Sequence, residues 1–146
     1  ETILDYESES FLDLGTGYGP IGIIYKTFKP LAQVSLIEIN ERAVQLAIKN
    51  ANKNKIKLEV LNNDGLQGID KTFDLIVTNP PIRAGKAIVY RFFEESFKHL
   101  NPQGLFIFVM NKKHGAPSAI KKCQSIFNEV AIINKKSGYY IIKCKK

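Results

Sequence analysis

Short apolar runs alternate with amphipathic stretches along most of the chain. This alternation predicts a mostly parallel sheet with helices on both faces, which is an α/β, doubly wound fold. The predicted strands are rich in Ile, Val, Leu or Phe and span residues 10–14, 33–38, 57–61, 73–78 and 105–110. The predicted helices fill most of the gaps and span residues 20–27, 41–52, 87–100 and 117–127.

The helix at residues 41–52 has the clearest pattern. Asn40 is a suitable N-cap, because its side chain can accept a hydrogen bond from a free amide of the first turn. The inward-facing apolar stripe of this helix is predicted to contain Val44, Leu46, Ala47 and Ala51.

The last segment departs from the alternation. Residues 129–133 and 139–144 have the composition of strands, and the short turn at 134–138 predicts that they pair as an antiparallel hairpin. Two more strands bring the sheet to seven. No internal repeat, low-complexity tract or linker divides the chain, so we expect residues 1–146 to form a single domain.

Length and composition exclude several classes of protein. With 146 residues, 45% of them apolar, the chain can bury one sizeable core. No stretch resembles a membrane span or a signal peptide, so we expect a soluble, cytoplasmic protein. Cys123 and Cys144 lack metal-ligand spacing, and we expect buried thiols without a disulfide or a metal. The chain begins at Glu1 and its one methionine is Met110, so part of the N-terminus is expected to be missing.

The net charge of +7 favours a polyanionic partner, because neutralised phosphates release counterions. Only three of the 21 basic residues are arginines, and the chain is rich in Lys, Ile and Asn. A genome-wide codon bias would have the same effect, so charge alone leaves both explanations open.

A glycine-rich turn with the sequence Asp-Leu-Gly-Thr-Gly-Tyr-Gly follows the first predicted strand at residues 13–19. Glycines allow positive φ and let a ligand approach the amides of a helix N-terminus. Gly17, Gly19 and Gly22 also match the spacing of dinucleotide-binding turns. An NAD enzyme and a merely tight turn are therefore alternatives to any other ligand here.

Three acidic residues narrow this choice. Asp13 precedes the first glycine, and Glu38 ends the second strand, where a carboxylate can accept both hydroxyls of a ribose. Asp64 follows the third strand, within reach of an adenine amino group, although an Asx-type turn beside Gly65 is the alternative. Three acids suit a ligand with a ribose, an adenine and an ammonium group but no pyrophosphate. S-adenosylmethionine is such a ligand.

Asn79, Pro80 and Pro81 end the apolar run at 73–78. Each proline fixes φ and lacks a donor, so the Asn79 amide oxygen and a free carbonyl point in fixed directions. Two aligned acceptors suit an amino group, and we assign catalysis to these three residues. If Asn79 and the Pro80 carbonyl accept the two N–H bonds of a target amine, its lone pair turns toward the methyl group without a strong general base.

These motifs resemble the class I S-adenosylmethionine-dependent methyltransferases. Within that class the chain is most similar to the small-subunit ribosomal RNA methyltransferase C family, which modifies the exocyclic N2 of guanine. The resemblance extends over residues 11–144 and depends on segments 13–22, 38–43, 73–81 and 84–86. It implies a Rossmann-like fold, S-adenosyl-L-methionine as cofactor, and ribosomal RNA or the small ribosomal subunit as partner.

The resemblance also implies roles for individual residues. Glu38 would bind the ribose, Asp64 the adenine amine, and Asn79 with Pro80 the target amine. The expected cofactor contacts are Asp13, Gly15, Thr16, Gly17, Gly19, Glu38, Ile39, Asp64 and Asn79. The expected substrate contacts are Ile82, Arg83, Lys86, Lys112 and Lys113.

Two features depart from the family pattern. The position after the prolines is usually aromatic and stacks on the substrate ring, but here it is Ile82. Stacking is worth about 1–3 kcal/mol per base, so its absence weakens a nucleobase substrate or moves stacking to another residue. Only about ten residues precede the glycine turn, so part of the cofactor lid or RNA platform is expected to be missing.

Two further functions compete with RNA methylation. A protein glutamine methyltransferase is the nearest, because Asn-Pro-Pro also suits a carboxamide nitrogen and Ile82 suits an aliphatic side chain. A module that binds the cofactor or RNA without catalysis is the alternative from another class. An NAD-dependent oxidoreductase leaves Asn79, Pro80 and Pro81 without a role.

Overall fold

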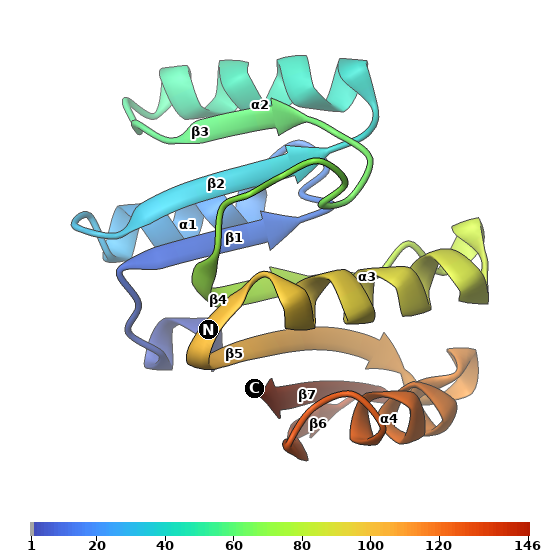
Figure 1. The fold of residues 1–146 in the computed structure, drawn as a ribbon. Helices are drawn as coiled ribbons and strands as arrows, with labels where there is room; N and C mark the ends of the chain where they lie inside the picture. Colours follow the sequence, from blue (N-terminus) through green and yellow to red (C-terminus); the bar gives the residue numbers. More distant parts are fainter. Residues whose placement is uncertain (1) are drawn as a thin grey trace.

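The computed structural model describes residues 2–146 and contains one seven-stranded sheet with helices on both faces (Figure 1). The strands are β1 Ser10–Leu14, β2 Gln33–Glu38, β3 Glu59–Asn62, β4 Phe73–Thr78, β5 Leu100–Asn111, β6 Glu129–Lys136 and β7 Tyr139–Lys145. The helices are α1 Pro20–Phe28, α2 Glu41–Lys53, α3 Lys86–Lys98 and α4 Ala116–Gln124, with short 3₁₀ turns η1 Thr2–Asp5, η2 Ile82–Ala84 and η3 Lys112–His114. The predicted α/β, doubly wound fold is confirmed.

The strand order is β3-β2-β1-β4-β5-β7-β6. Neighbours from β3 to β5 are parallel, whereas β7 is antiparallel to both β5 and β6. The predicted hairpin is therefore confirmed, but β6 continues to Lys136. Ser137 and Gly138 form the turn with φ of 54° and 82°, as a two-residue hairpin loop with the right twist requires.

Two hydrophobic layers hold the helices on the sheet, one on each face. Leu12 and Phe106 belong to the layer beneath α3 and α4, which also contains Phe93 of α3. Phe11 belongs to the opposite layer, where its ring stacks on Tyr25 of α1 at 3.9 Å between centroids. Neighbouring residues of β1 thus point to opposite layers, because side chains alternate along a strand. This arrangement explains why the central strands are apolar without interruption.

Local predictions on a helix cap and on two buried, free thiols are also confirmed. The Asn40 side chain accepts a hydrogen bond from the Ala43 amide at 3.0 Å and so caps α2. Cys123 and Cys144 are free, buried thiols, and contact with Cys123 together with burial raises the pKa of Cys144. No helix within residues 2–146 is long and apolar enough to cross a membrane.

Two predictions on α2 and β5 are wrong. Leu46 is 47% exposed, since it lies about 100° around the helix from the buried Ala47. β5 begins at Leu100, which we assigned to the preceding helix, because Leu100 pairs with Phe73. Gln103, with φ of 68°, then interrupts the strand before regular pairing resumes. Such an irregularity cannot be seen in an apolar pattern.

Candidate active site

The carboxyl ends of β1, β2 and β4 lie side by side at one edge of the sheet (Figure 1). Leu14 of β1 pairs with Ile37 of β2 and with Thr78 of β4. The glycine turn, Glu38 and Asn79 therefore begin at the same level of the sheet. Ligands of open α/β sheets bind at this edge. The structure thus brings together three predicted segments that lie far apart in the sequence.

The glycine turn has the conformation that its sequence predicts. Gly15, Gly17 and Gly19 have φ of 70°, 63° and 96°, which side chains with a Cβ rarely tolerate. The amides of Gly15 and Thr16 donate to the Ile37 carbonyl at 2.8 and 3.0 Å. These two bonds fasten the turn to the end of β2.

Asp13 is almost completely buried and holds the same turn from inside. Its Oδ2 accepts hydrogen bonds from Thr16 Oγ1 at 2.6 Å and from the Gly22 amide at 3.2 Å. Burial raises the pKa of Asp13 to about 6, although the two hydrogen bonds act in the opposite direction. The structure therefore gives Asp13 a supporting position within the turn, and its expected contact with a cofactor stays a prediction.

Glu38 binds the outer side of the turn. Its Oε1 accepts from the Gly17 amide at 2.8 Å and its Oε2 from the Asn40 amide at 3.0 Å. Each carboxylate oxygen has a further lone pair, so both can still accept a ribose hydroxyl. Ile39, the next residue, is 63% exposed at the same edge.

Asp64 forms a paired salt bridge with Arg91 of α3. Arg91 Nη2 donates to Oδ1 at 2.5 Å and Nη1 to Oδ2 at 3.2 Å, and these bonds lower the pKa of Asp64. Arg91, which follows the two prolines by ten residues, therefore pairs with an acidic residue of the site. The Asx-type turn that was the alternative for Asp64 is not formed by its side chain, which binds Arg91, whereas Asn63 donates to the Gly65 and Gln67 carbonyls.

Asn79 lies exposed just beyond β4. Within residues 2–146 its side chain forms no hydrogen bond, so its amide is available to a ligand. The Pro80 carbonyl accepts the Ile82 amide at 2.9 Å and keeps a second lone pair. Thr78 Oγ1 donates to the Leu14 carbonyl at 2.6 Å and ties this segment to β1.

The predicted substrate residues lie at the same edge of the sheet. Ile82 and Arg83 belong to η2, Lys86 begins α3, and Lys112 and Lys113 belong to η3 after β5. All five are exposed. The segments after β4 and after β5 are thus placed together, as predicted.

Between α3 and α4 is a hollow of about 210 Å³ that the sequence did not indicate. Its lining residues are Ile82, Lys86, Val89, Tyr90, Met110, His114, Gly115, Ser118 and Ala119. Tyr90 follows Lys86 by four residues, so both side chains lie on the same face of α3. This spacing was the one signal in the sequence for the hollow. His114 lies in η3 at the hollow.

Sequence reasoning also missed a polar contact behind Glu38. Asn62 Nδ2 donates to the Glu38 carbonyl at 3.0 Å and to the Ile39 carbonyl at 2.9 Å. No local pattern signals it, since Asn62 ends another strand. The contact holds the backbone on which the Glu38 carboxylate depends.

The chain matches the methyltransferase small domain family over residues 1–143. It is 46% identical over 138 residues to uncharacterized protein YbxB of Bacillus subtilis (strain 168), covering 92% of this chain and 69% of that one. It is 30% identical over 138 residues to ribosomal RNA small subunit methyltransferase C of Haemophilus influenzae (strain PittGG). There the alignment covers 92% of this chain but 41% of the relative, so the chain spans about two fifths of that protein.

Solved structures have the same fold. A T. thermophilus 16S rRNA N2 methyltransferase, RsmC, in complex with AdoMet and guanosine has a TM-score of 0.82 and 26% identity, covering 94% of this chain and 37% of that one. A methyltransferase from Pyrococcus furiosus has a TM-score of 0.84 at 24% identity, over 94% and 75% of the two chains. The family match and the fold confirm the predicted class, and this chain belongs to the methyltransferase small domain family of S-adenosylmethionine-dependent enzymes.

Proposed function

We propose that this domain transfers a methyl group from S-adenosylmethionine to an exocyclic amine of RNA, in particular guanine N2 of small-subunit ribosomal RNA in the cytoplasm. The observation that carries the proposal is the position of Asn79. Its free side chain lies beyond β4 at the level where β1 and β2 end in the glycine turn and Glu38. A relative and a structural neighbour named as ribosomal RNA methyltransferases support the choice of substrate.

The residues at the edge suit the proposed cofactor. A Cβ built on Gly17 would meet nothing within 4 Å, so the turn has open space beside it. The remaining lone pairs of Glu38 would hold the ribose, and those of Asp64 the adenine amine. When bound, the cofactor would supply a methyl group on a sulfonium. We infer that Asp13, Gly15, Thr16, Gly19 and Ile39 complete the set of cofactor contacts.

Asn79 and Pro80 would prepare the target nitrogen. An exocyclic amine is a poor nucleophile, since its lone pair is delocalised into the ring. Two acceptors aligned on its N–H bonds favour a tetrahedral nitrogen and stabilise the positive charge that grows on it. The second lone pair of the Pro80 carbonyl leaves it free for this role while Ile82 is bound. Pro81 keeps the segment rigid.

The distribution of charge favours RNA over a protein substrate. Residues 100–146, which form β5, α4, β6 and β7, contain nine lysines and one acidic residue, Glu129. Residues 1–99 contain twelve basic and thirteen acidic residues. A genome-wide codon bias would spread lysine over the whole chain, whereas here the positive charge is concentrated at the β5-β7-β6 end of the sheet. A polyanion fits that end.

A labelling experiment tests the proposal. The protein is incubated with radiolabelled S-adenosylmethionine and with small ribosomal subunits, or their RNA, from a strain that lacks the gene. We expect labelled N2-methylguanosine after digestion of the RNA. Label on glutamine of a ribosomal protein would instead support the protein methyltransferase, and no transfer despite cofactor binding would support the non-catalytic module.

Replacement of Asn79 tests the catalytic role. Asn79→Ala should lower kcat by about 10²- to 10³-fold, as expected for the loss of one contact that stabilises growing charge. Affinity for S-adenosylmethionine, measured by calorimetry, should stay within a few-fold of the unchanged protein. Asn52→Ala, at an exposed position of α2, is the control and should retain full activity. An unchanged rate in Asn79→Ala would refute the assignment.

A further inference from the structure

The hollow between α3 and α4 has an apolar interior and basic side chains at its rim. Val89, Met110 and Ala119 in its lining are buried core residues. Lys86 at the start of α3 and His114 of η3 line it, next to Ile82. Ile82 comes three residues after Asn79, so the hollow begins where the proposed catalytic segment ends. A flat apolar group bearing a nearby negative charge fits these surroundings.

Tyr90 supplies an aromatic ring to this hollow. Its neighbour Phe93 lies 5.6 Å away between ring centroids, at an angle of 27°, and holds the Tyr90 ring from the core side. Tyr90 is the aromatic residue among those that line the hollow. A ring is therefore present on α3, although position 82 lacks one.

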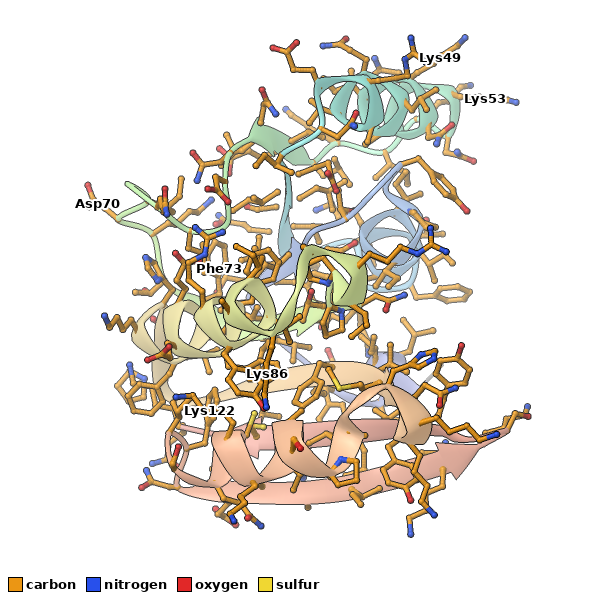
Figure 2. The ribbon with its side chains drawn as sticks, turned by 90° about the vertical axis from the view of Figure 1, so that its right-hand side faces the viewer. Lys49, Lys53, Asp70, Phe73, Lys86 and Lys122 are labelled. Carbon is orange, nitrogen blue, oxygen red and sulfur yellow. The ribbon has the colours of Figure 1, made fainter. Side chains whose placement is uncertain are left out.

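Two lysines flank the Tyr90 ring. Lys86 Nζ lies 5.4 Å and Lys122 Nζ 5.7 Å from its centroid. Figure 2 shows both side chains where α3 faces α4, whereas Lys49 and Lys53 lie on α2 at the far end of the molecule. Within the described residues neither Lys86 nor Lys122 forms an ion pair with a carboxylate. Two ammonium groups beside one ring, without a local counter-charge, form a place for phosphate.

We propose that this hollow is a nucleobase-binding subsite for the substrate RNA, with Tyr90 as the stacking ring and Lys86 and Lys122 as contacts to the phosphates flanking the bound base. The inference rests on the proposed function in RNA methylation. It assigns to α3 the stacking surface that the segment after the two prolines lacks. Any base can stack on an aromatic ring, whatever the RNA sequence, and cations beside the ring bind the phosphate backbone.

The experiment measures stacking directly, without turnover. A short single-stranded ribo-oligonucleotide containing 2-aminopurine is titrated with the protein, whose lack of tryptophan leaves the 2-aminopurine emission clear. Tyr90→Leu keeps apolar volume without a ring, and Tyr90→Phe keeps the ring. We expect Tyr90→Leu to abolish the quenching and weaken affinity by about fivefold or more, and Tyr90→Phe to preserve both.

A matched control separates stacking from folding. Phe28→Leu removes an exposed ring near the opposite end of the β-strands, and it should bind the oligonucleotide as the unchanged protein does. Melting temperature and S-adenosylmethionine affinity are measured on every variant. Quenching and affinity in Tyr90→Leu equal to those of the unchanged protein would overturn the inference.

The lysines are tested by salt dependence. Lys122→Gln should reduce the slope of log affinity against log salt by about 0.7, the value for one phosphate contact on a single strand. Lys53→Gln, on α2, should leave the slope unchanged. An unchanged slope in Lys122→Gln would overturn the phosphate contact. If the unchanged protein shows quenching that needs Tyr90 but transfers no methyl group to RNA, the proposed function fails while the subsite stands.

Discussion

At the scale of single residues, burial separates the acidic side chains of the site. Asp13 is 1% exposed and bound within the turn, whereas the Asp64 side chain is 45% exposed and paired with Arg91. Glu38 lies between these extremes and accepts two backbone amides. Three carboxylates that look equivalent in the sequence therefore differ in burial and in what they can bind.

The raised pKa of Asp13 predicts a pH dependence of stability. Asp13 has a pKa of about 6 when folded and 3.8 as its ordinary value. Between these two values the folded state retains a proton that the unfolded state has released, so the free energy of unfolding falls as pH rises. We expect a decrease on the order of 2–3 kcal/mol from this group between pH 4 and pH 7.

Asp13→Asn isolates this contribution. The variant cannot ionise at position 13, while the other carboxylates, such as Asp64 and Asp74 with their lowered pKa, are the same in both proteins. Urea unfolding of both proteins at several pH values measures the difference. The free energy of unfolding of Asp13→Asn, relative to that of the unchanged protein, should increase between pH 4 and 6 and stay constant above pH 6. A difference independent of pH would contradict a raised pKa.

At the scale of elements, the approach of α1 to β2 depends on Gly22. A Cβ at this position would meet Leu36 Cδ2 at 2.0 Å, closer than any real contact. This packing sets α1 directly behind the glycine turn, so it also sets the position of the turn. The contact between α1 and β2 therefore stabilises the core and also fixes the position of the glycine turn.

Gly22→Ala should lower the free energy of unfolding by about 1–3 kcal/mol, the usual cost of overpacking. Leu36→Ala should be destabilising by itself, since Leu36 is fully buried. Adding Gly22→Ala to Leu36→Ala should cost less than in the unchanged protein, because the clashing methyl group is gone. Urea unfolding of the unchanged protein, the two single variants and the double variant measures the coupling energy between the two positions. If the two effects are simply additive, the contact between Gly22 and Leu36 is not the cause of the destabilisation.

At the scale of the whole molecule, the positive charge lies mainly on one end of the sheet. β5, α4 and the β6–β7 hairpin carry it, and η3 brings Lys112 and Lys113 to the ligand edge. The Lys112 amide donates to the Gly138 carbonyl at 2.8 Å, so the hairpin turn is attached to that edge. The charged end of the sheet therefore adjoins the edge that carries the proposed site.

Charge removal at this region should weaken RNA binding more than the same change elsewhere. Lys112→Gln with Lys113→Gln should reduce the salt slope for ribosomal RNA by up to about 1.4–1.8, as for two lost phosphate contacts. Lys49→Gln with Lys53→Gln on α2 removes the same charge at the far end and is the control (Figure 2). Filter binding at several salt concentrations measures both. Equal effects of the two double variants would mean that only net charge matters.

Most of the fold followed from the sequence, because its signals are local. β1, β2 and β4 were predicted with their observed bounds, and the Asn40 cap was recognised from one residue type before a helix. Leu100 was misplaced because its strand conformation comes from pairing with Phe73, which is a contact distant in the sequence and not a local signal. Leu46 was wrongly placed because apolar character alone does not decide which side of a helix is covered.

The sequence by itself determined the chemical groups of the site and their places at strand ends, since periodicity, glycine turns and prolines act over a few residues. It also indicated the methyltransferase class. Only the tertiary structure decided which partners the charged groups choose, as with Arg91 on Asp64 and Gly17 on Glu38. It also decided that Tyr90 and Lys122 meet across two helices, because such contacts depend on how elements pack and leave no trace in local spacing.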